Sequence, residues 1–424
     1  MTAVLTSAES AALQAVDTDA AGDLLLALLA VPSVTGSAAE SELQHRLSAH
    51  LDTLGLDVDL WPMDLAALSA EPGFPGTEAA REQAWGLVAS TPGGDDGPTL
   101  ILQAHVDVVP PGDLAQWQGD PFQPRVVGDV VHGRGACDMK AGLVANLAAV
   151  AAIRASGVRL RGRLAVHCVV SEEDGGLGAY GTLQRGHTGD ACIITEPTSG
   201  TLITANGGAL TFTIRVPGSA THASTRDCGV SAIDAYLPIH RALAELERQR
   251  NTRPDPLMAE YPIPHTLSVG IVRAGDWASS VPDLLIAEGR LGVRLDEDPA
   301  QARIEFEHCI ADTCARDPWL REHPARVEWT GGQFASGRLQ AGHPLRDLVQ
   351  GAHAAATGTG PLRERGAPYG SDLRLYGAAG VPTLHFGPGD VRVAHSPREQ
   401  VPLGELHDVT RTLVLAALRT VGTR

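Results

Sequence analysis

The sequence predicts an α/β fold in which a mostly parallel sheet is flanked by helices and is interrupted by a second, smaller domain. Three observations lead to this prediction. Short apolar runs rich in β-branched residues recur along the chain, each followed by Gly, Pro or an acidic residue, and helical segments separate several of them. A stretch in the middle has its own complete order of strands and helices. In addition, a chain of 424 residues is too long for one ordinary hydrophobic core.

The elements of the larger domain are predicted from apolar periodicity. An amphipathic helix is expected over about 38–54, "AAESELQHRLSAHLDTL". The apolar runs that follow have the length and composition of strands buried on both faces. These runs are "AWGLVAST" (84–91), "PTLILQAHVDVV" (98–109), "RLAVHCVV" (163–170), "DACIIT" (190–195) and, much later, "VPTLHFG" (381–387). Helices over 139–156 and 342–357 lie between strands, which favours a parallel sheet.

The middle of the chain, residues 208–331, has a different pattern. Its segments are "ALTFTIRV", the helix "SAIDAYLPIHRALAELERQR", the strands "HTLSVGIVRAG" and "LLIAEGRLGVRL", the helix "AQARIEFEHCIADTCAR" and the strand "ARVEWTG". This order is β-α-β-β-α-β, the ferredoxin-like arrangement, and it is complete within itself. We therefore predict one domain made of residues 1–207 and 332–424, with residues 208–331 inserted into it.

Composition excludes several classes of partner. A hydrophobic content of 43% and a charged content of 20% are those of a soluble globular protein. The net charge of -17 argues against nucleic acid and against an anionic membrane as partner. The apolar run "LLLALLAV" (24–31) is too short to span a membrane and follows acidic residues, unlike a secretory signal. The six cysteines form no C-x-x-C pair, so we expect a cytoplasmic protein without a disulfide framework or a zinc ribbon.

Polar side chains follow the predicted strands at the edge where open α/β sheets bind their ligands. Grouped by strand, they are His105 and Asp107 towards the end of the second strand, Glu172 and Glu173 in "SEED" after the third, Glu196 in "TEPT" after the fourth, and His395 after the last. Asp138 is added by the start of the helix in "HGRGACDMKAG".

Each of these residues, taken alone, also has an ordinary structural explanation. A chain of this composition contains about two His-x-acid pairs by chance. Asp138 suits a helix N-cap, "EED" suits a solvated turn, and Glu196 suits a loop before proline. His395 suits an exposed surface.

Their combination favours a metal centre. Carboxylates gathered on one rim without solvent or partners either shift their pKa values or bind a cation. A mixed set of histidines and carboxylates suits zinc, cobalt or manganese better than calcium. One bridging aspartate with two further ligands for each ion is enough for a pair of ions about 3.5–4 Å apart.

The motifs carry a resemblance to a known family. Taken together, "AHVDVVP", "HGRGACDMKAG", "SEEDGGLG", "TEPT", "GSATHAS" and "AHSPREQV" resemble the metallopeptidase family of acetylornithine deacetylase, succinyl-diaminopimelate desuccinylase, aminoacylase and glutamate carboxypeptidase. The motifs occur in the right order over nearly the whole chain, including the inserted domain, and their context is most similar to the acetylornithine deacetylase branch.

The resemblance implies two divalent ions, with zinc preferred over cobalt and manganese. It implies that His105 and Glu196 hold one ion, that Glu173 and His395 hold the other, and that Asp138 bridges them. 

The same resemblance implies the supporting roles. Asp107 would orient His105, Glu172 would be the general base, and the peptide bond after Asp138 would be cis.

The resemblance also implies substrate-binding groups. His222 of "THAS" would stabilise the oxyanion, and Arg374 of "YGSDLRLYG" would bind a substrate carboxylate. His222 as a turn residue and Arg374 in an ion pair with Asp372 are the alternatives. Ser279 of "ASSVPD" stands where the family often has an asparagine that donates to substrate. A serine is shorter and has one donor, so we expect different substrate contacts at this position. The segment "NGGALTF" (206–212) falls where the family hinges between its domains.

The sequence thus predicts a metal-dependent amidohydrolase that removes the acyl group of a small N-acyl amino acid. A dipeptidase or carboxypeptidase of the same family is the alternative. A homodimer formed through the inserted domain is expected from relatives. A non-catalytic metal-binding relative should lack Glu172 or one of the expected metal ligands, and this sequence has all of these residues. A serine hydrolase should have a G-x-S-x-G elbow, which this chain lacks.

Overall fold

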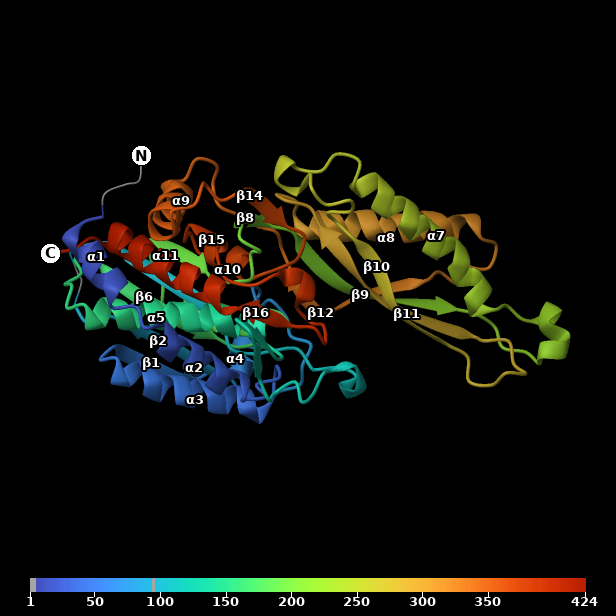
Figure 1. Cartoon of the computed structure of the whole chain (residues 1–424). Helices are drawn as coiled ribbons and strands as arrows, with labels where there is room; N and C mark the ends of the chain where they lie inside the picture. The colour runs from blue at the N-terminus through green and yellow to red at the C-terminus, as the bar shows by residue number, and fades with distance from the viewer. Residues whose placement is uncertain (1–4, 94–95) are drawn as a thin grey trace. The chain divides into compact units, whose positions relative to one another are not determined.

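The structure, a computed structural model, describes residues 5–93 and 96–424, which divide into two compact units (Figure 1). The first unit runs to Ala205 and continues through Arg338–Arg365 and Leu375–Arg424. The second unit comprises Asn206–Gly337 together with Gly366–Arg374.

The first unit is built on a nine-stranded sheet of order β1-β2-β6-β3-β7-β15-β8-β13, with β14 paired to β8. The strands are β1 (Asp57–Pro62), β2 (Trp85–Ser90), β3 (Thr99–His105), β6 (Arg163–Val169), β7 (Ala191–Ile194), β8 (Leu202–Asn206), β13 (Gly337–Arg338), β14 (Glu364–Ala367) and β15 (Thr383–His385). The central strands β6, β3, β7 and β15 are parallel, as predicted. The outer pairs β1–β2, β2–β6 and β15–β8 are antiparallel.

The first unit also contains a small three-stranded sheet, in which the strand order is β16-β5-β4. Its strands are β4 (Arg125–Val127), β5 (Val130–His132) and β16 (Gln400–Pro402), all paired antiparallel. This sheet joins the segment before Asp138 to the segment after His395, because β16 pairs with β5 from Gln400 opposite His132.

Helices flank the main sheet. They are α1 (Ser7–Gln14), α2 (Thr18–Leu29), α3 (Ala38–Thr53), α4 (Leu65–Ser69), α5 (Ala141–Ala155), α6 (Leu177–Gln184), α9 (Pro344–Thr357), α10 (Leu373–Ala378) and α11 (Leu403–Val421). Short helical turns are η1 (Leu114–Gln116), η2 (Ala136–Lys140), η3 (Ala223–Cys228), η4 (Pro256–Met258) and η5 (Val391–Val393). Helix α3 starts where the sequence predicts, because the hydroxyl of Ser37 accepts a hydrogen bond from the Glu40 amide as an N-cap.

Helix α5 is the core helix of this unit and lies beside α11 (Figure 1). The segment Ala136–Ala155 is long and apolar enough to cross a membrane by composition, but 83% of its most apolar 18-residue stretch is buried inside the fold, which is typical of a core helix. Gly142 allows its close approach to β7, since a Cβ there would lie 2.0 Å from the carbonyl oxygen of Thr195. The end of β7 is thereby held against the start of α5.

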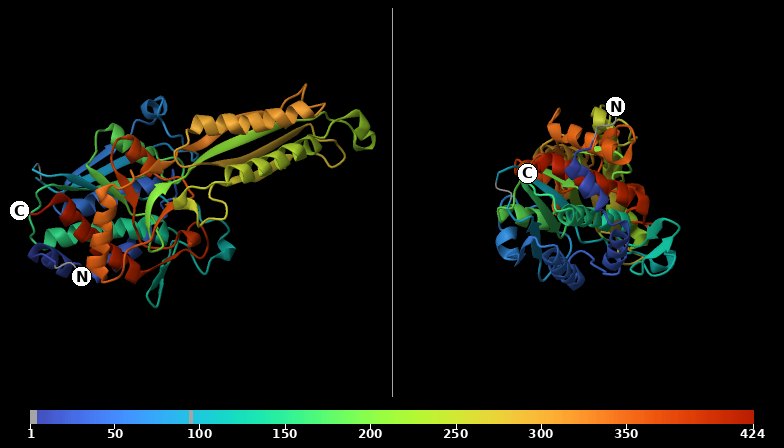
Figure 2. Two further views of the ribbon diagram at one scale, coloured as in Figure 1. Left: turned by 90° about the horizontal axis from the view of Figure 1, so that it is seen from above. Right: turned by 60° about the vertical axis from the view of Figure 1, so that its left-hand side comes forward.

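The second unit has a four-stranded antiparallel sheet of order β10-β11-β9-β12. Its elements are β9 (Gly208–Pro217), α7 (Ala232–Arg250), β10 (Leu267–Ala274), β11 (Leu284–Val293), α8 (Pro299–Arg316) and β12 (Arg326–Phe334). Both helices lie side by side over the sheet (Figures 1 and 2). Their core includes Phe212 of β9 and Phe306 of α8, whose ring centres are 4.5 Å apart. The order of elements is the predicted ferredoxin-like one.

His167, in the core of the first unit, gives a prediction about stability in acid. It is 1% exposed, and its Nδ1 lies 2.8 Å from the hydroxyl of Tyr376. Burial, with a further contribution from His187, lowers the pKa of His167 to about 3. Below pH 6.5 the His167 imidazole is protonated in the unfolded chain but stays neutral in the folded chain. The contribution of His167 to stability is therefore complete above pH 6.5 and is lost as the pH falls towards 3.

We expect the free energy of unfolding to fall by about 2 kcal/mol between pH 7 and pH 5 because of this one residue. Urea unfolding of the wild-type chain and of His167→Gln at the two pH values measures the difference. The variant should be less stable at pH 7 but should lose less stability on acidification. The same loss in both proteins would show that His167 is not the group responsible.

Candidate metal centre

His105 is the last residue of β3 and is buried at the end of the sheet. Its Nδ1 lies 2.9 Å from the main-chain carbonyl oxygen of Asp107 and 3.5 Å from the Asp107 carboxylate. A carbonyl oxygen only accepts, so Nδ1 carries the proton and Nε2 presents its lone pair when the ring is neutral. Nε2 faces Asp138 Oδ1 at 3.1 Å and Glu196 Oε1 at 3.8 Å. This nitrogen therefore needs a proton or a metal ion between itself and the carboxylates.

The fully buried carboxylate of Asp107 orients the turn that carries the two glutamates. It accepts hydrogen bonds from the Glu172 and Glu173 amides, at 3.3 and 3.4 Å, and from the Thr35 hydroxyl at 2.9 Å. Burial raises the pKa of this carboxyl group, but His105 and these donors outweigh burial and leave the pKa lowered. Asp107 therefore contacts both His105 and the glutamate turn.

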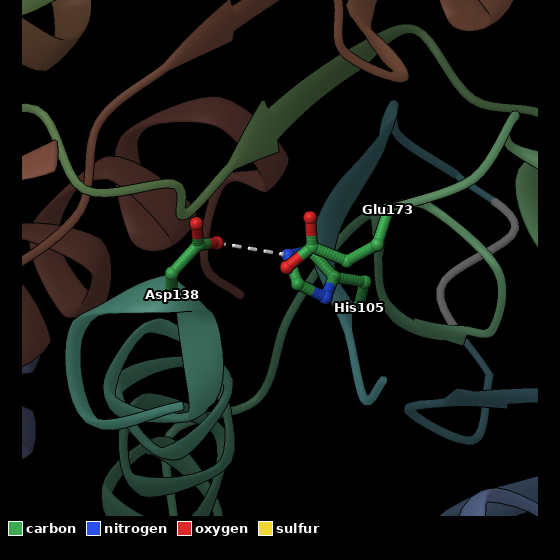
Figure 3. A group of neighbouring side chains, drawn as sticks. All are labelled: His105, Asp138 and Glu173. Carbon is green, nitrogen blue, oxygen red and sulfur yellow. Dashed lines mark hydrogen bonds and ion pairs between the residues drawn. The ribbon is translucent and has the colours of Figure 1, made fainter. Parts of the chain in front are cut away.

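Asp138 lies in the irregular turn η2, ahead of α5, and the Asp138–Met139 peptide bond is cis, as the resemblance implied. Its carboxylate does not cap α5, whose N-cap is Lys140 without a side-chain hydrogen bond. Instead Oδ1 faces His105 Nε2 at 3.1 Å, the contact drawn in Figure 3, and Oδ2 faces His395 Nε2 at 3.3 Å. Burial raises the pKa of Asp138, but the two histidines lower it by more, so the pKa lies below its usual value. One carboxylate thus lies between two imidazoles.

His395 and Glu173 form the other side of the cluster. His395 Nε2 lies 3.1 Å from one Glu173 carboxylate oxygen and 3.3 Å from the other. Burial lowers the pKa of His395, but Asp138 and Glu173 raise it to about 11. Burial and the charge of Asp138 raise the pKa of Glu173. The negative charge of these carboxylates is stabilised by a nearby positive charge. A divalent ion provides that charge while the histidines stay neutral.

The donor atoms fit transition-metal ions. One donor atom from each of His105, Asp138 and Glu173 lies within 4.8 Å of the others, and the same holds for His105, Glu172 and Glu196. Two ligands bound tetrahedrally to zinc at 2.0–2.1 Å lie about 3.3 Å apart. The His–Asp138 separations of 3.1 and 3.3 Å match that value. Nitrogen and carboxylate donors together suit zinc, cobalt or manganese.

Three predicted site residues belong to the second unit. His222 pairs with Ser280, and the Ser279 carbonyl accepts from the Ala223 amide at 2.8 Å, so His222 and Ser279 are neighbours. The Ser224 amide donates to Nδ1 of the exposed His222 at 3.2 Å, which leaves the proton on Nε2 and makes Nε2 a donor.

Arg374 is buried in the same unit. It donates to the Ser371 carbonyl at 2.7 Å, and its guanidinium lies 4.1 Å from the centre of the Phe334 ring. Asn206 and Gly207, expected at a hinge, are the first residues of this unit, where the Gly207 amide donates to the Ala367 carbonyl at 2.8 Å.

Sequence reasoning missed a buried pair next to Asp138. Glu399 accepts from the Asp138 amide and forms an ion pair with Arg134. Both residues lie inside the quoted motifs "HGRGACDMKAG" and "AHSPREQV", yet each reads as an ordinary loop charge. Their separation of 265 residues left no local signal.

The sequence matches a known family over most of its length. The model of peptidase family M20/M25/M40 matches residues 101–419, more than half of the chain. The chain belongs to this M20 family. The resemblance drawn from the motifs is confirmed.

Two curated relatives align with nearly the whole chain. The N-formyl-4-amino-5-aminomethyl-2-methylpyrimidine deformylase of Halalkalibacterium halodurans is 28% identical over 415 residues, covering 92% of each chain. The succinyl-diaminopimelate desuccinylase of Leptothrix cholodnii is 30% identical over 411 residues, covering 92% of this chain and 97% of that protein. The chain is therefore a metal-dependent amide hydrolase of the M20 family.

Solved structures share the M20 fold. A dipeptidase of Saccharomyces cerevisiae has a TM-score of 0.76 at 14% identity and covers 96% of this chain and 97% of its own. A Bacillus subtilis protein described as a dinuclear metal binding peptidase of the M20 family has a TM-score of 0.62 at 16% identity, covering 95% and 98%.

Proposed function

We propose that the protein is a deacylase that hydrolyses the amide bond of an N-acyl amino acid at a centre of two divalent ions, zinc in preference to cobalt or manganese. The observation that carries this proposal is the position of Asp138, whose two carboxylate oxygens face His105 and His395 separately. A carboxylate placed in this way suits a ligand shared by two ions. Glu196 beside His105 and Glu173 beside His395 supply one further ligand on each side.

When bound, the ions supply Lewis acidity and lower the pKa of a water molecule at the site. Glu172 is assigned as the general base, because it lies within 4.8 Å of His105 and Glu196 and is 7% exposed. Its carboxylate takes a proton from the attacking water and later delivers it to the nitrogen of the leaving amine. Asp107 holds the Glu172 amide and thereby fixes the start of this side chain.

The groups of the second unit are assigned to the substrate. His222 donates its Nε2 proton to the amide oxygen as negative charge develops there, Ser279 donates its hydroxyl, and Arg374 pairs with the carboxylate of the amino-acid half. The Ser224 contact supports this role for His222, since it keeps Nδ1 as the acceptor. A serine reaches less far than an asparagine, so contacts from Ser279 should be weaker than those of an asparagine at this position.

The names of the relatives support acyl removal over peptide hydrolysis. The deformylase and the desuccinylase, both enzymes that remove an acyl group, align with 92% of this chain at 28% and 30% identity. The Saccharomyces cerevisiae dipeptidase is 14% identical and supports the fold alone. A dipeptidase or carboxypeptidase is therefore the second candidate, with the same centre acting on a peptide bond.

A substrate panel tests the proposal. The protein is depleted of metal, zinc, cobalt or manganese is restored, and N-formyl, N-acetyl and N-succinyl amino acids are assayed beside dipeptides. We expect kcat/KM for the best N-acyl amino acid to exceed that for any dipeptide by at least about tenfold, equivalent to about 1.4 kcal/mol in transition-state binding. A dipeptide as the best substrate would favour the second candidate. Equal rates with and without metal would contradict the metal-dependent mechanism.

A homodimer formed through the second unit is also part of the proposal, as is a cytoplasmic location. The strand β10 is an edge of its sheet, and Ile271, Val272 and Trp277 are 42%, 51% and 73% exposed on it and just after it. Exposed apolar edge strands are usually covered in solution, and pairing with a second copy covers them.

A further inference from the structure

The buried carboxylate of Glu399 contacts the main chain at Asp138. The residue is 1% exposed, and its Oε1 accepts hydrogen bonds from the Cys137 amide at 3.3 Å and from the Asp138 amide at 3.2 Å. These two amides belong to the turn whose backbone angles are non-helical at Asp138. The contact therefore fixes the main chain from which the Asp138 carboxylate projects.

Arg134 holds the other oxygen of the same carboxylate. Its Nη1 pairs with Glu399 Oε2, and the arginine is 1% exposed. The arginine is itself fixed, because its amide donates to the Pro121 carbonyl at 2.9 Å and its guanidinium lies 5.1 Å from the centre of the Trp117 ring. The Gly133 amide donates to the Glu399 main-chain carbonyl at 3.2 Å, so side chain and backbone both connect the two segments.

Glu399 is also four residues after His395, on the same loop. The loop that carries His395 is thereby fastened to the turn that carries Asp138, and these two residues face each other at 3.3 Å. His105 has a separate support, since the Asp107 carbonyl lies 2.9 Å from its Nδ1. Glu399 thus anchors both Asp138 and the loop of His395, whereas His105 has an anchor of its own.

We propose that Glu399, with Arg134, is a positioning residue that sets the distance between Asp138 and His395 and so determines the affinity for the ion on the His395–Glu173 side. This inference rests on the proposed function, because it takes Asp138 and His395 as ligands. Groups that orient metal ligands typically change metal affinity by about 10–100-fold when removed. The effect should fall mainly on one of the two ions.

The test is zinc titration of Glu399→Gln against a chelating competitor, beside the wild-type chain and Arg398→Gln. Arg398 is the exposed neighbour of Glu399 and serves as the matched control. Glutamine keeps the length and one acceptor oxygen but loses the charge that pairs with Arg134. We expect the wild-type chain and Arg398→Gln each to bind two zinc ions, and we expect each ion to bind the two proteins with the same affinity. Glu399→Gln should bind one ion with unchanged affinity and the second about 10–100-fold more weakly.

Absorption of the cobalt-substituted proteins provides a second readout, since the d–d bands report ligand geometry. They should change in Glu399→Gln and not in Arg398→Gln. If Glu399→Gln does not fold, Glu399→Asp keeps the charge with a shorter reach and should show the same selective loss.

The outcomes separate the two proposals. If a folded Glu399 variant bound both zinc ions as tightly as the wild-type chain does, this inference would be overturned and the proposed function would remain intact. Equal weakening of both ions would also overturn it, because the selectivity would be absent. A wild-type chain that bound no zinc, cobalt or manganese would overturn the proposed function, and this inference with it.

Discussion

Glu172→Gln is expected to lower kcat on the best substrate by about 10²–10⁴-fold while the protein keeps both metal ions. The glutamine has nearly the same size and can occupy the same buried position, but it cannot take a proton from water or deliver one to the leaving nitrogen. KM should change little, because the side chain is assigned to proton transfer and not to substrate binding. Steady-state kinetics together with the zinc content per chain measure both parts of the expectation.

The adjacent Glu173 provides the contrast for this experiment. Glu173 faces His395 and is assigned as a ligand, so Glu173→Gln should lower the zinc content as well as the rate. The two neighbouring glutamates should therefore differ in metal binding although both variants lose activity. Wild-type rates in Glu172→Gln would rule out the proposed mechanism, and loss of zinc from it would reassign Glu172 to the ligand set.

The positions of several metal-centre residues could be predicted from the sequence because each ends or follows a recognisable strand or lies at the start of a helix. His105 ends β3, Glu196 follows β7, and Asp138 precedes α5, so the ends of these elements bring them together. The central parallel strands were predictable for the same reason. The antiparallel pairing of β2 with β6 was not, since strand direction depends on connections that an apolar run does not encode.

The supporting contacts could not be predicted, because they join distant segments or depend on exact backbone geometry. Arg134 and Glu399 are 265 residues apart, and Thr35 reaches Asp107 across 72. The sequence predicts that Asp107 orients His105, but it does not say which oxygen lies nearer, and the main-chain carbonyl lies 2.9 Å from His105 Nδ1 against 3.5 Å for the carboxylate. The carboxylate also accepts from the glutamate turn, a contact that only the folded chain creates.

Asp138→Asn is expected to have the broadest effect, because the Asp138 carboxylate faces His105 with one oxygen and His395 with the other. The amide retains one oxygen, so at most one histidine can keep an oxygen opposite its Nε2, and the other would face an NH₂ group. Lewis acid assistance is worth several kcal/mol, so kcat should fall by at least about 10³-fold. Both zinc ions should bind more weakly, unlike the selective loss expected for Glu399→Gln.

Thermal unfolding with and without added zinc checks this expectation without relying on activity. An ion that binds only the folded chain raises Tm in proportion to the logarithm of its concentration over Kd. Zinc should therefore raise the Tm of the wild-type chain and have a much smaller effect on Asp138→Asn at the same concentration. Circular dichroism of the variant checks that the fold is retained. If Asp138→Asn kept two tightly bound ions and hydrolysed substrate normally, Asp138 would not be a shared ligand, and the position of its carboxylate between two histidines would need a structural explanation instead.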